Sequence, residues 1–196
     1  MTAAMAEALR KAAQDRQNLL IAGGTGSGKT TLANAILAEP AFAGDRVVLI
    51  EDTAELQCAA ADRLEMLTKR TDPPVTMTYL VRDTLRLRPD RIITGEVRDG
   101  SALDLLKAWN TGHPGELATI HANSAVEALS RLEDLNGEVT QRVPYRAIAQ
   151  AINLVVFIER TPSGRQVRSV TRVIGRDGDA YRLCRNRGLP RAAIMG

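Results

Sequence analysis

The chain has 196 residues, of which 44% are hydrophobic and 25% charged, and its formal net charge is +3. This length suits one well-packed domain with a small appendage, and every apolar run falls short of the roughly 18 residues that a membrane span needs. Residues 1–17 lack the apolar stretch of a signal peptide, so we predict that they form a surface helix of a cytoplasmic protein. Cys58 and Cys184 have no paired spacing, which argues against a zinc site and favours reduced thiols, with a disulfide between them as the alternative.

Strands and helices are predicted to alternate from residue 17 to residue 152. Short apolar runs that end in polar or turn residues predict strands, and apolar residues at helical spacing predict helices. The strands cover 17–24, 45–56, 90–97 and 115–123, and the helices cover 28–40, 75–89, 101–112, 124–137 and 145–152.

A polar connection is predicted between residues 57 and 74, and a meander of strands is predicted to end the chain. The strands of the meander cover 153–160, 168–176 and 180–185, with turns at the sequences PSG and RDGD. We therefore expect an α/β fold, in which a mostly parallel sheet is flanked by helices and continues into an antiparallel extension. Residues 1–160 would form the core, and residues 161–196 an arginine-rich meander of the same domain.

The charge is unevenly distributed along the chain. Residues 161–196 contain eight arginines but only two acidic side chains, whereas residues 1–160 have a small acidic excess. Anionic lipid, nucleic acid or an acidic neighbouring subunit would suit such a segment. The simpler interpretation is a solvated edge of strands and loops, and we predict no specific contact with nucleic acid.

A glycine-rich loop between the first strand and the next helix predicts a phosphate site. The sequence GGTGSGKT fits the pattern G-x-x-x-x-G-K-[ST], whose backbone N–H groups surround a phosphate at a helix N-terminus. Lys29 would reach the β- and γ-phosphates, and the Thr30 hydroxyl would bind Mg²⁺. The alternative is a coincidental glycine turn. The expected ligands are ATP and Mg²⁺, and the expected binding residues are Gly23, Gly24, Thr25, Gly26, Ser27, Gly28, Lys29, Thr30 and Thr31.

Polar side chains end three further strands, and in a parallel sheet they would gather at the edge that holds the phosphate loop. Nucleotide hydrolysis needs a carboxylate for Mg²⁺ and another that orients water. Any one of these polar side chains could merely end a strand in solvent, but three pairs at one edge favour a site. The pairs are Glu51 and Asp52, Glu96 and Arg98, and His121 and Asn123.

Four motifs together resemble the secretion or traffic ATPases, the hexameric motors of type II and type IV secretion, type IV pili and conjugation. They are GGTGSGKTT, IEDTAEL, RPDRIITGEVRDGSALDLLKAWNTGHPG and ATIHANS, in this order. The stretch LLKAWNTGHPGELATIHANSAVEALSRLEDL is most similar to the conjugal-transfer, TrbB-like branch. The resemblance extends from about residue 6 to residue 185. It implies a P-loop, RecA-like fold, a homo-hexamer, and partners in the inner-membrane secretion or conjugation machinery at the cytoplasmic face of the bacterial inner membrane.

The resemblance also implies roles for particular residues. Residues 23–31 would be the Walker A loop, Glu51 the acidic-box glutamate that polarises water, and Glu96 the Walker B glutamate that acts on Mg²⁺ together with Thr30. His121 would sense the γ-phosphate, although an isolated histidine is more often a core residue. His113 is more suited to shaping a turn. Some of the arginines around the 90–97 strand would face a neighbouring subunit's nucleotide, and the alternative is that they are ordinary arginines on a helix surface. The candidates are Arg82, Arg86, Arg88, Arg91 and Arg98.

Two departures from the family pattern affect these expectations. Glu116 stands where a second glycine is usual after GHPG, which would put a charge on that loop. Relatives also carry an N-terminal domain before the first helix predicted here, and that domain supplies arginines to the phosphates. Because such arginines are worth roughly 10³–10⁵ in turnover, we expect this chain to bind Mg²⁺-ATP loosely, to hydrolyse it slowly and to be mainly monomeric.

Other nucleotide-binding classes remain as alternatives. A small-molecule kinase would need an arginine-rich lid and no TIHAN sequence. A GTPase would need [NT]-K-x-D, and TKRTD at residues 68–72 places its acid one residue too late. Two alternatives are more serious. One is a type II secretion or pilus ATPase, and the other is an assembly subunit that binds ATP with little turnover. Measured hydrolysis compared with measured binding separates a motor from a passive subunit.

Overall fold

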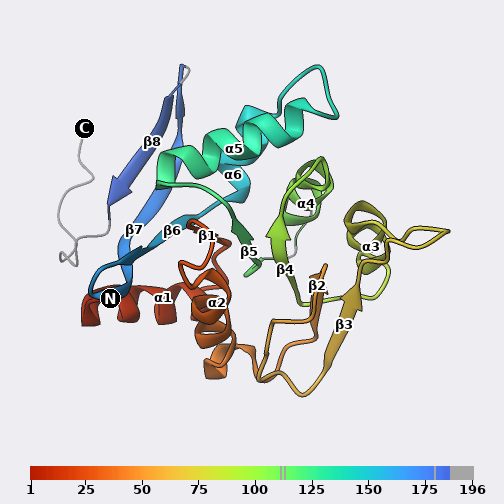
Figure 1. Cartoon of the computed structure of the whole chain (residues 1–196), viewed down its shortest axis with the longest axis horizontal. Helices are drawn as coiled ribbons and strands as arrows, with labels where there is room; N and C mark the ends of the chain where they lie inside the picture. The colour runs from red at the N-terminus through yellow and green to blue at the C-terminus, as the bar shows by residue number, and fades with distance from the viewer. Residues whose placement is uncertain (111, 113, 179, 186–196) are drawn as a thin grey trace.

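The structure is a computed structural model, and it describes residues 1–110, 112, 114–178 and 180–185. In this part of the chain one sheet has the strand order β3-β2-β4-β5-β1-β6-β7-β8 (Figure 1). Every neighbouring pair from β3 to β6 is parallel, and β7 is antiparallel to both β6 and β8. The predicted parallel sheet with an antiparallel extension is confirmed. The strands are β1 (Leu19–Ala22), β2 (Val47–Glu51), β3 (Arg63–Leu67), β4 (Arg91–Val97), β5 (Leu117–Ile120), β6 (Leu154–Thr161), β7 (Gly164–Asp177) and β8 (Ala180–Arg185).

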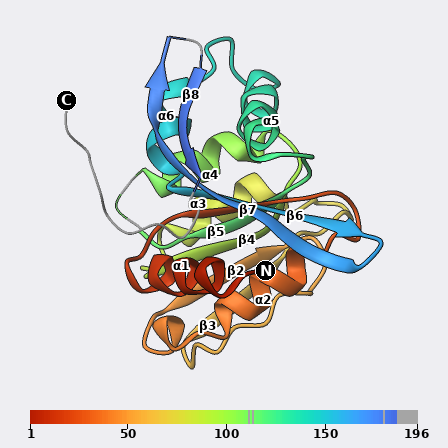
Figure 2. The same cartoon turned by 90° about the vertical axis from the view of Figure 1, so that its left-hand side faces the viewer.

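Helices cover both faces of the sheet, because the central strands are buried on both sides and their side chains alternate between two apolar cores. Leu20 and Ala22 of β1 belong to the core beneath α3–α6, whereas Leu19 and Ile21 belong to the core beneath α1 and α2. Figure 2 shows α1 and α2 on one side, with α5 and α6 on the other. The helices are α1 (Ala3–Gln14), α2 (Lys29–Leu37), α3 (Met77–Thr84), α4 (Ser101–Trp109), α5 (Ala125–Gly137) and α6 (Tyr145–Ala151), with a short 3₁₀ helix, η1 (Pro40–Phe42).

The segment predicted to be a polar connection contains β3, so that prediction is wrong for residues 63–67. β3 pairs with β2 at the edge of the sheet, where Leu64 and Leu67 remain 38% and 49% exposed. An edge strand with little burial lacks the apolar pattern by which the other strands were identified. Two smaller differences are that α3 ends at Thr84 rather than near Pro89, and that β7 begins at Gly164 rather than at residue 168.

Arg91 is a structural residue of the core, which corrects the expectation that it could face another subunit. It is 1% exposed, and its Nε donates a hydrogen bond of 2.6 Å to Asp45 Oδ2. Its Nη1 donates to Ala13 O at 3.1 Å, and the guanidinium stacks 4.2 Å from the centre of the Phe42 ring. Arg91 therefore joins α1, η1 and the start of β4. Cys58 and Cys184 are free thiols, as predicted. No helix in the described ranges has the length and apolar character needed to cross a membrane.

Glu116, which was expected to put a charge on its loop, is buried directly before β5. Its exposed fraction is 0%, and both carboxylate oxygens lack a hydrogen-bond partner among the described residues. Its backbone is fixed, because Glu116 N donates to Asn18 Oδ1 and Glu116 O accepts from Leu19 N. Burial raises the pKa of the Glu116 carboxyl well above its ordinary value. The folded chain thus favours the protonated acid at this position.

Glu116→Gln is expected to stabilise the fold at neutral pH by about 1–3 kcal/mol, because the amide is neutral without taking up a proton, whereas burial forces the carboxyl to be protonated above its ordinary pKa at a cost of about 1.4 kcal/mol per pH unit. Above the ordinary pKa the unfolded state has released this proton while the folded state keeps it, so wild-type stability falls as the pH rises. The gain of the variant should therefore be larger at pH 8.5 than at pH 5.5 in urea unfolding. The exposed Glu138→Gln serves as the control. A gain that does not depend on pH would contradict this account of Glu116.

Candidate functional site

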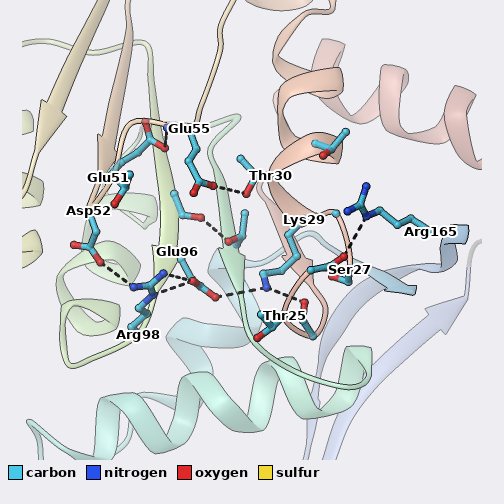
Figure 3. A pocket seen from close by; sticks show the side chains of 17 residues that line it. Thr25, Ser27, Lys29, Thr30, Glu51, Asp52, Glu55, Glu96, Arg98 and Arg165 are labelled. Atoms are coloured by element: carbon cyan, nitrogen blue, oxygen red, sulfur yellow. Dashed lines mark hydrogen bonds and ion pairs between the residues drawn. The ribbon is translucent and has the colours of Figure 1, made fainter. Parts of the chain in front are cut away.

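A cavity of about 490 Å³ opens at the carboxyl edge of the parallel strands, where a ligand site is expected in such sheets. Five segments line it, and Figure 3 shows their side chains facing one another. Eight of the nine predicted nucleotide-binding residues line it, and the ninth, Gly23, is buried. The lining residues are Gly24–Thr31 from the glycine loop and α2, Glu51 at the end of β2, Asp52, Thr53 and Glu55 after it, Gly95, Glu96 and Arg98 from β4 and its end, Thr119 of β5, and Arg165 of β7.

The glycine loop requires glycine at three positions. Gly26 and Gly28 have φ values of 69° and 98°, in the left-handed region that other residues rarely adopt. Gly28 is the N-cap of α2, so the helix begins where the loop ends. A Cβ on Gly23 would lie 2.4 Å from Ile158 O of β6, so the loop could not pack against β6 with a larger residue there. The backbone N–H groups and the positive end of the α2 dipole can therefore hold a phosphate.

Lys29 connects the loop to the carboxylate of β4. Its Nζ donates to Gly23 O at 3.0 Å and to Gly24 O at 3.3 Å, and lies 3.6 Å from Glu96 Oε1. Lys29 Nζ therefore lies close to the loop carbonyls and to the Glu96 carboxylate, at the first turn of α2. This is where a cation can hold the terminal phosphates of a nucleotide.

Glu96 and Asp52 share Arg98. The Arg98 guanidinium donates to Glu96 Oε2 at 2.8 and 2.6 Å, and its Nη1 lies 3.4 Å from Asp52 Oδ2. The hydrogen bond to Glu96 is the main reason why the pKa of Arg98 is raised. Cations therefore flank the Glu96 carboxylate on both sides within the lining of the cavity.

Glu51 holds the backbone of the loop that follows β2. Its carboxylate is 5% exposed, and its Oε1 accepts hydrogen bonds from Glu55 N at 3.0 Å and Leu56 N at 2.9 Å. Burial raises the pKa of the Glu51 carboxyl. A Cβ on Gly95 would lie 3.0 Å from Glu51 Cγ, so the glycine of β4 leaves room for this side chain. At least one carboxylate oxygen of Glu51 is thus committed to the local structure.

Glu55 is a site residue to which the sequence prediction gave no role. Thr30 Oγ1 donates to Glu55 Oε2 at 3.2 Å, so this carboxylate lies next to the hydroxyl predicted to bind Mg²⁺. Asn34 of α2 braces the same segment, because its Nδ2 donates to Glu55 O and its Oδ1 accepts from Gln57 N. The sequence signal was the second glutamate of EDTAEL, four residues after Glu51.

His121 and Asn123 follow β5, but neither is among the residues that line the cavity. His121 is exposed, and its role as a phosphate sensor remains a prediction. Asn123 N donates to Glu127 Oε2, and Glu127 N donates to Ser124 Oγ, so this segment caps α5. His113 lies outside the described residues.

The donors of the cavity suit Mg²⁺ bound together with phosphates. Across the described ranges, no group of three or more acidic, histidine or cysteine side chains could hold a metal ion without other ligands. Mg²⁺ usually keeps several waters and takes one or two carboxylates plus the phosphates of the substrate. The Thr30 hydroxyl, Glu96 and Glu55 present such oxygens within one cavity.

Comparisons with known proteins agree on one family. The family profile described as "Type II/IV secretion system protein" matches residues 1–192. The conjugal transfer protein TrbB of Rhizobium radiobacter is 54% identical over 183 residues, which is 92% of this chain and 56% of that protein. The type IV secretion system protein PtlH of Bordetella pertussis is 39% identical over 181 residues, or 87% of this chain and 53% of that protein.

A solved relative agrees in fold. The VirB11 ATPase of the Brucella suis type IV secretion system, in complex with sulphate, has a TM-score of 0.78 and 31% identity to this chain. The match covers 85% of this chain and 51% of that one. The predicted P-loop ATPase fold is therefore confirmed. The chain spans about half the length of the curated relatives it matches.

Proposed function

This chain belongs to the Type II/IV secretion system protein family, and we propose that its cavity binds Mg²⁺-ATP and hydrolyses it to drive type IV secretion or conjugal DNA transfer. The observation that carries this proposal is the juxtaposition, across one cavity, of the loop that ends in Lys29 and Thr30 with the carboxylates Glu96 and Glu55. A phosphate-binding loop alone fits many nucleotide-binding proteins. Carboxylates next to it supply what hydrolysis additionally needs.

Phosphate binding and metal coordination fall to two sets of residues in this proposal, which share Thr30. Residues 23–31 hold the phosphates through backbone N–H groups, and Lys29 neutralises the β- and γ-phosphates. Thr30 and Glu96 hold Mg²⁺, which when bound neutralises charge that develops on the transferred phosphoryl group. Glu96 Oε2 becomes available for Mg²⁺ when it is released from Arg98. Arg98 then keeps Asp52 as its carboxylate partner.

Two glutamates are candidates for orienting the attacking water. The family resemblance favours Glu51, whereas the geometry favours Glu55, because Glu51 accepts two backbone hydrogen bonds and Glu55 extends to Thr30. We assign the water to Glu55 and the support of its loop to Glu51. His121 senses the γ-phosphate by approaching the nucleotide from the end of β5.

The whole protein works as a homo-hexameric ring in this proposal. It acts with the inner-membrane secretion machinery, at the cytoplasmic face of the membrane. The alternative is an assembly subunit that binds ATP with little turnover. The discriminating experiment measures phosphate release and molar mass for this chain and for a protein of the relatives' full length that contains it. We expect slow turnover and monomers for the chain, and fast turnover by a ring for the longer protein. Absence of turnover in an assembled ring would favour the passive subunit.

Thr30→Ala is expected to remove most of the dependence of ATP binding on Mg²⁺. The hydroxyl donates to the Glu55 carboxylate at 3.2 Å, and loss of a metal-site group typically costs on the order of 10–100-fold in metal affinity. The affinity of Thr30→Ala for ATP should be similar whether it is measured in the presence of Mg²⁺ or of EDTA. Thr30→Ser keeps the hydroxyl and should keep the difference. If the alanine variant retains the full Mg²⁺ effect, the metal is held elsewhere.

A further inference from the structure

Arg165 reaches the phosphate loop from the antiparallel extension of the sheet. It is the second residue of β7, yet its Nε donates a hydrogen bond of 3.1 Å to Gly26 O, 139 residues away in the chain. Its stem crosses the start of α2, because a Cβ on Gly28 would lie 2.8 Å from Arg165 Cδ. Arg165 is also one of the residues that line the cavity.

The charge of Arg165 has no acidic partner among the described residues, and the bond from Nε to Gly26 is the only one that its guanidinium makes with them. Within the described ranges, neither terminal amino group donates to another protein group. Arg168, three residues further along β7, differs because its Nε lies 3.1 Å from Glu159 Oε1. A guanidinium that is held through Nε at a phosphate cavity, and whose amino groups have no partner in the described part of the chain, is suited to an anionic oxygen.

The position of Arg165 indicates which phosphate it meets. In Figure 3, Arg165 lies at the end of the cavity away from Glu96, Arg98 and Asp52, with the loop and Lys29 between them. Lys29 and the carboxylates belong to the β- and γ-phosphates and to Mg²⁺. The opposite end is left for the α-phosphate and the nucleoside.

We propose that Arg165 binds the α-phosphate of the nucleotide and so couples the β6–β7 hairpin to nucleotide occupancy. This inference rests on the proposed ATP site and adds a residue from outside its four motifs. It also gives one arginine of the arginine-rich extension a role beyond solvation. Because ADP and ATP share the α-phosphate, Arg165 should contribute equally to the binding of both.

The test compares Arg165→Ala with the matched control Arg168→Ala by displacement of a fluorescent ADP analogue. Competitors are ATP, ADP and inorganic pyrophosphate, which fills the two terminal phosphate positions but carries no α-phosphate. We expect Arg165→Ala to weaken the binding of ATP and of ADP by a similar factor of about 10, which is the scale of a charge-assisted hydrogen bond. Pyrophosphate should bind as in the wild type, and Arg168→Ala should change nothing.

The other outcomes are distinct. Equal weakening of all three competitors would show that Arg165 only supports the shape of the loop, and unchanged affinities would show that it does not meet the nucleotide. Either result overturns the inference but leaves the ATP site intact. If the folded wild-type chain binds none of the competitors, the proposed function fails, and this inference fails with it.

Discussion

Glu55→Gln is expected to lower the rate of ATP hydrolysis by roughly 10²–10⁴, the usual loss when a positioned acid–base group is removed. ATP should still bind, because the variant retains the glycine loop, Lys29 and Glu96. The physical reason is that the Glu55 carboxylate is held at Thr30 by a backbone that Glu51 and Asn34 both brace. A neutral amide keeps the shape but cannot attract a proton from water. Single-turnover hydrolysis and nucleotide affinity, measured in a protein of the relatives' full length, separate the two steps.

Glu51→Gln is the matched control for this prediction. Its amide oxygen can still accept from Glu55 N and Leu56 N, so the loop should keep its shape and hydrolysis should fall much less. Glu51→Leu removes the hydrogen-bond acceptor, so it should disturb the conformation of the loop and lower the rate of ATP hydrolysis. If Glu51→Gln abolishes hydrolysis while Glu55→Gln does not, the water-orienting role belongs to Glu51, as the family resemblance implies.

Lys29→Ala is expected to weaken ATP binding by about 100-fold or more. The ammonium lies among the loop carbonyls and 3.6 Å from Glu96, and each charge-assisted contact that it would make to a phosphate is worth about 1.5–3 kcal/mol. Without it, Glu96 would also repel the phosphates at close range. Fluorescence titration with an ATP analogue gives the affinity.

Lys107→Ala is the control for the loss of a positive charge, since Lys107 pairs with Asp104 on α4 away from the cavity. It should bind ATP as the wild type does. Equal affinities for the wild type and Lys29→Ala would show that the glycine loop is not the phosphate site.

Much of the fold could be predicted because its signals are local. The buried strands β1, β2 and β4 are short apolar runs, and the glycine loop identifies where β1 gives way to α2. β3 could not be recognised in this way, because an edge strand with exposed side chains has no apolar pattern. The carboxyl edge of the sheet then predicted that Glu51 and Glu96 would lie in one cavity, which the structure confirms.

The remaining parts of the site depend on contacts between distant segments. Glu55 acquires its position from Asn34 of α2, and Arg165 meets Gly26 only because the β6–β7 hairpin packs beside the loop. Burial also depends on distant segments, which is why the sequence did not separate Arg91 from surface arginines and led us to expect a charge on the loop at Glu116. His121 lies at the predicted edge but outside the cavity lining, so sequence position alone does not fix the direction of a side chain.

The most direct test of the central claim, that this cavity is a Mg²⁺-ATP site, is calorimetric titration of the folded wild-type chain with ATP in the presence of Mg²⁺. The account predicts one site per chain, weaker binding when EDTA replaces Mg²⁺, and displacement of ATP by ADP. Absence of saturable binding at millimolar ATP, in a chain whose circular dichroism shows the α/β fold, would contradict it.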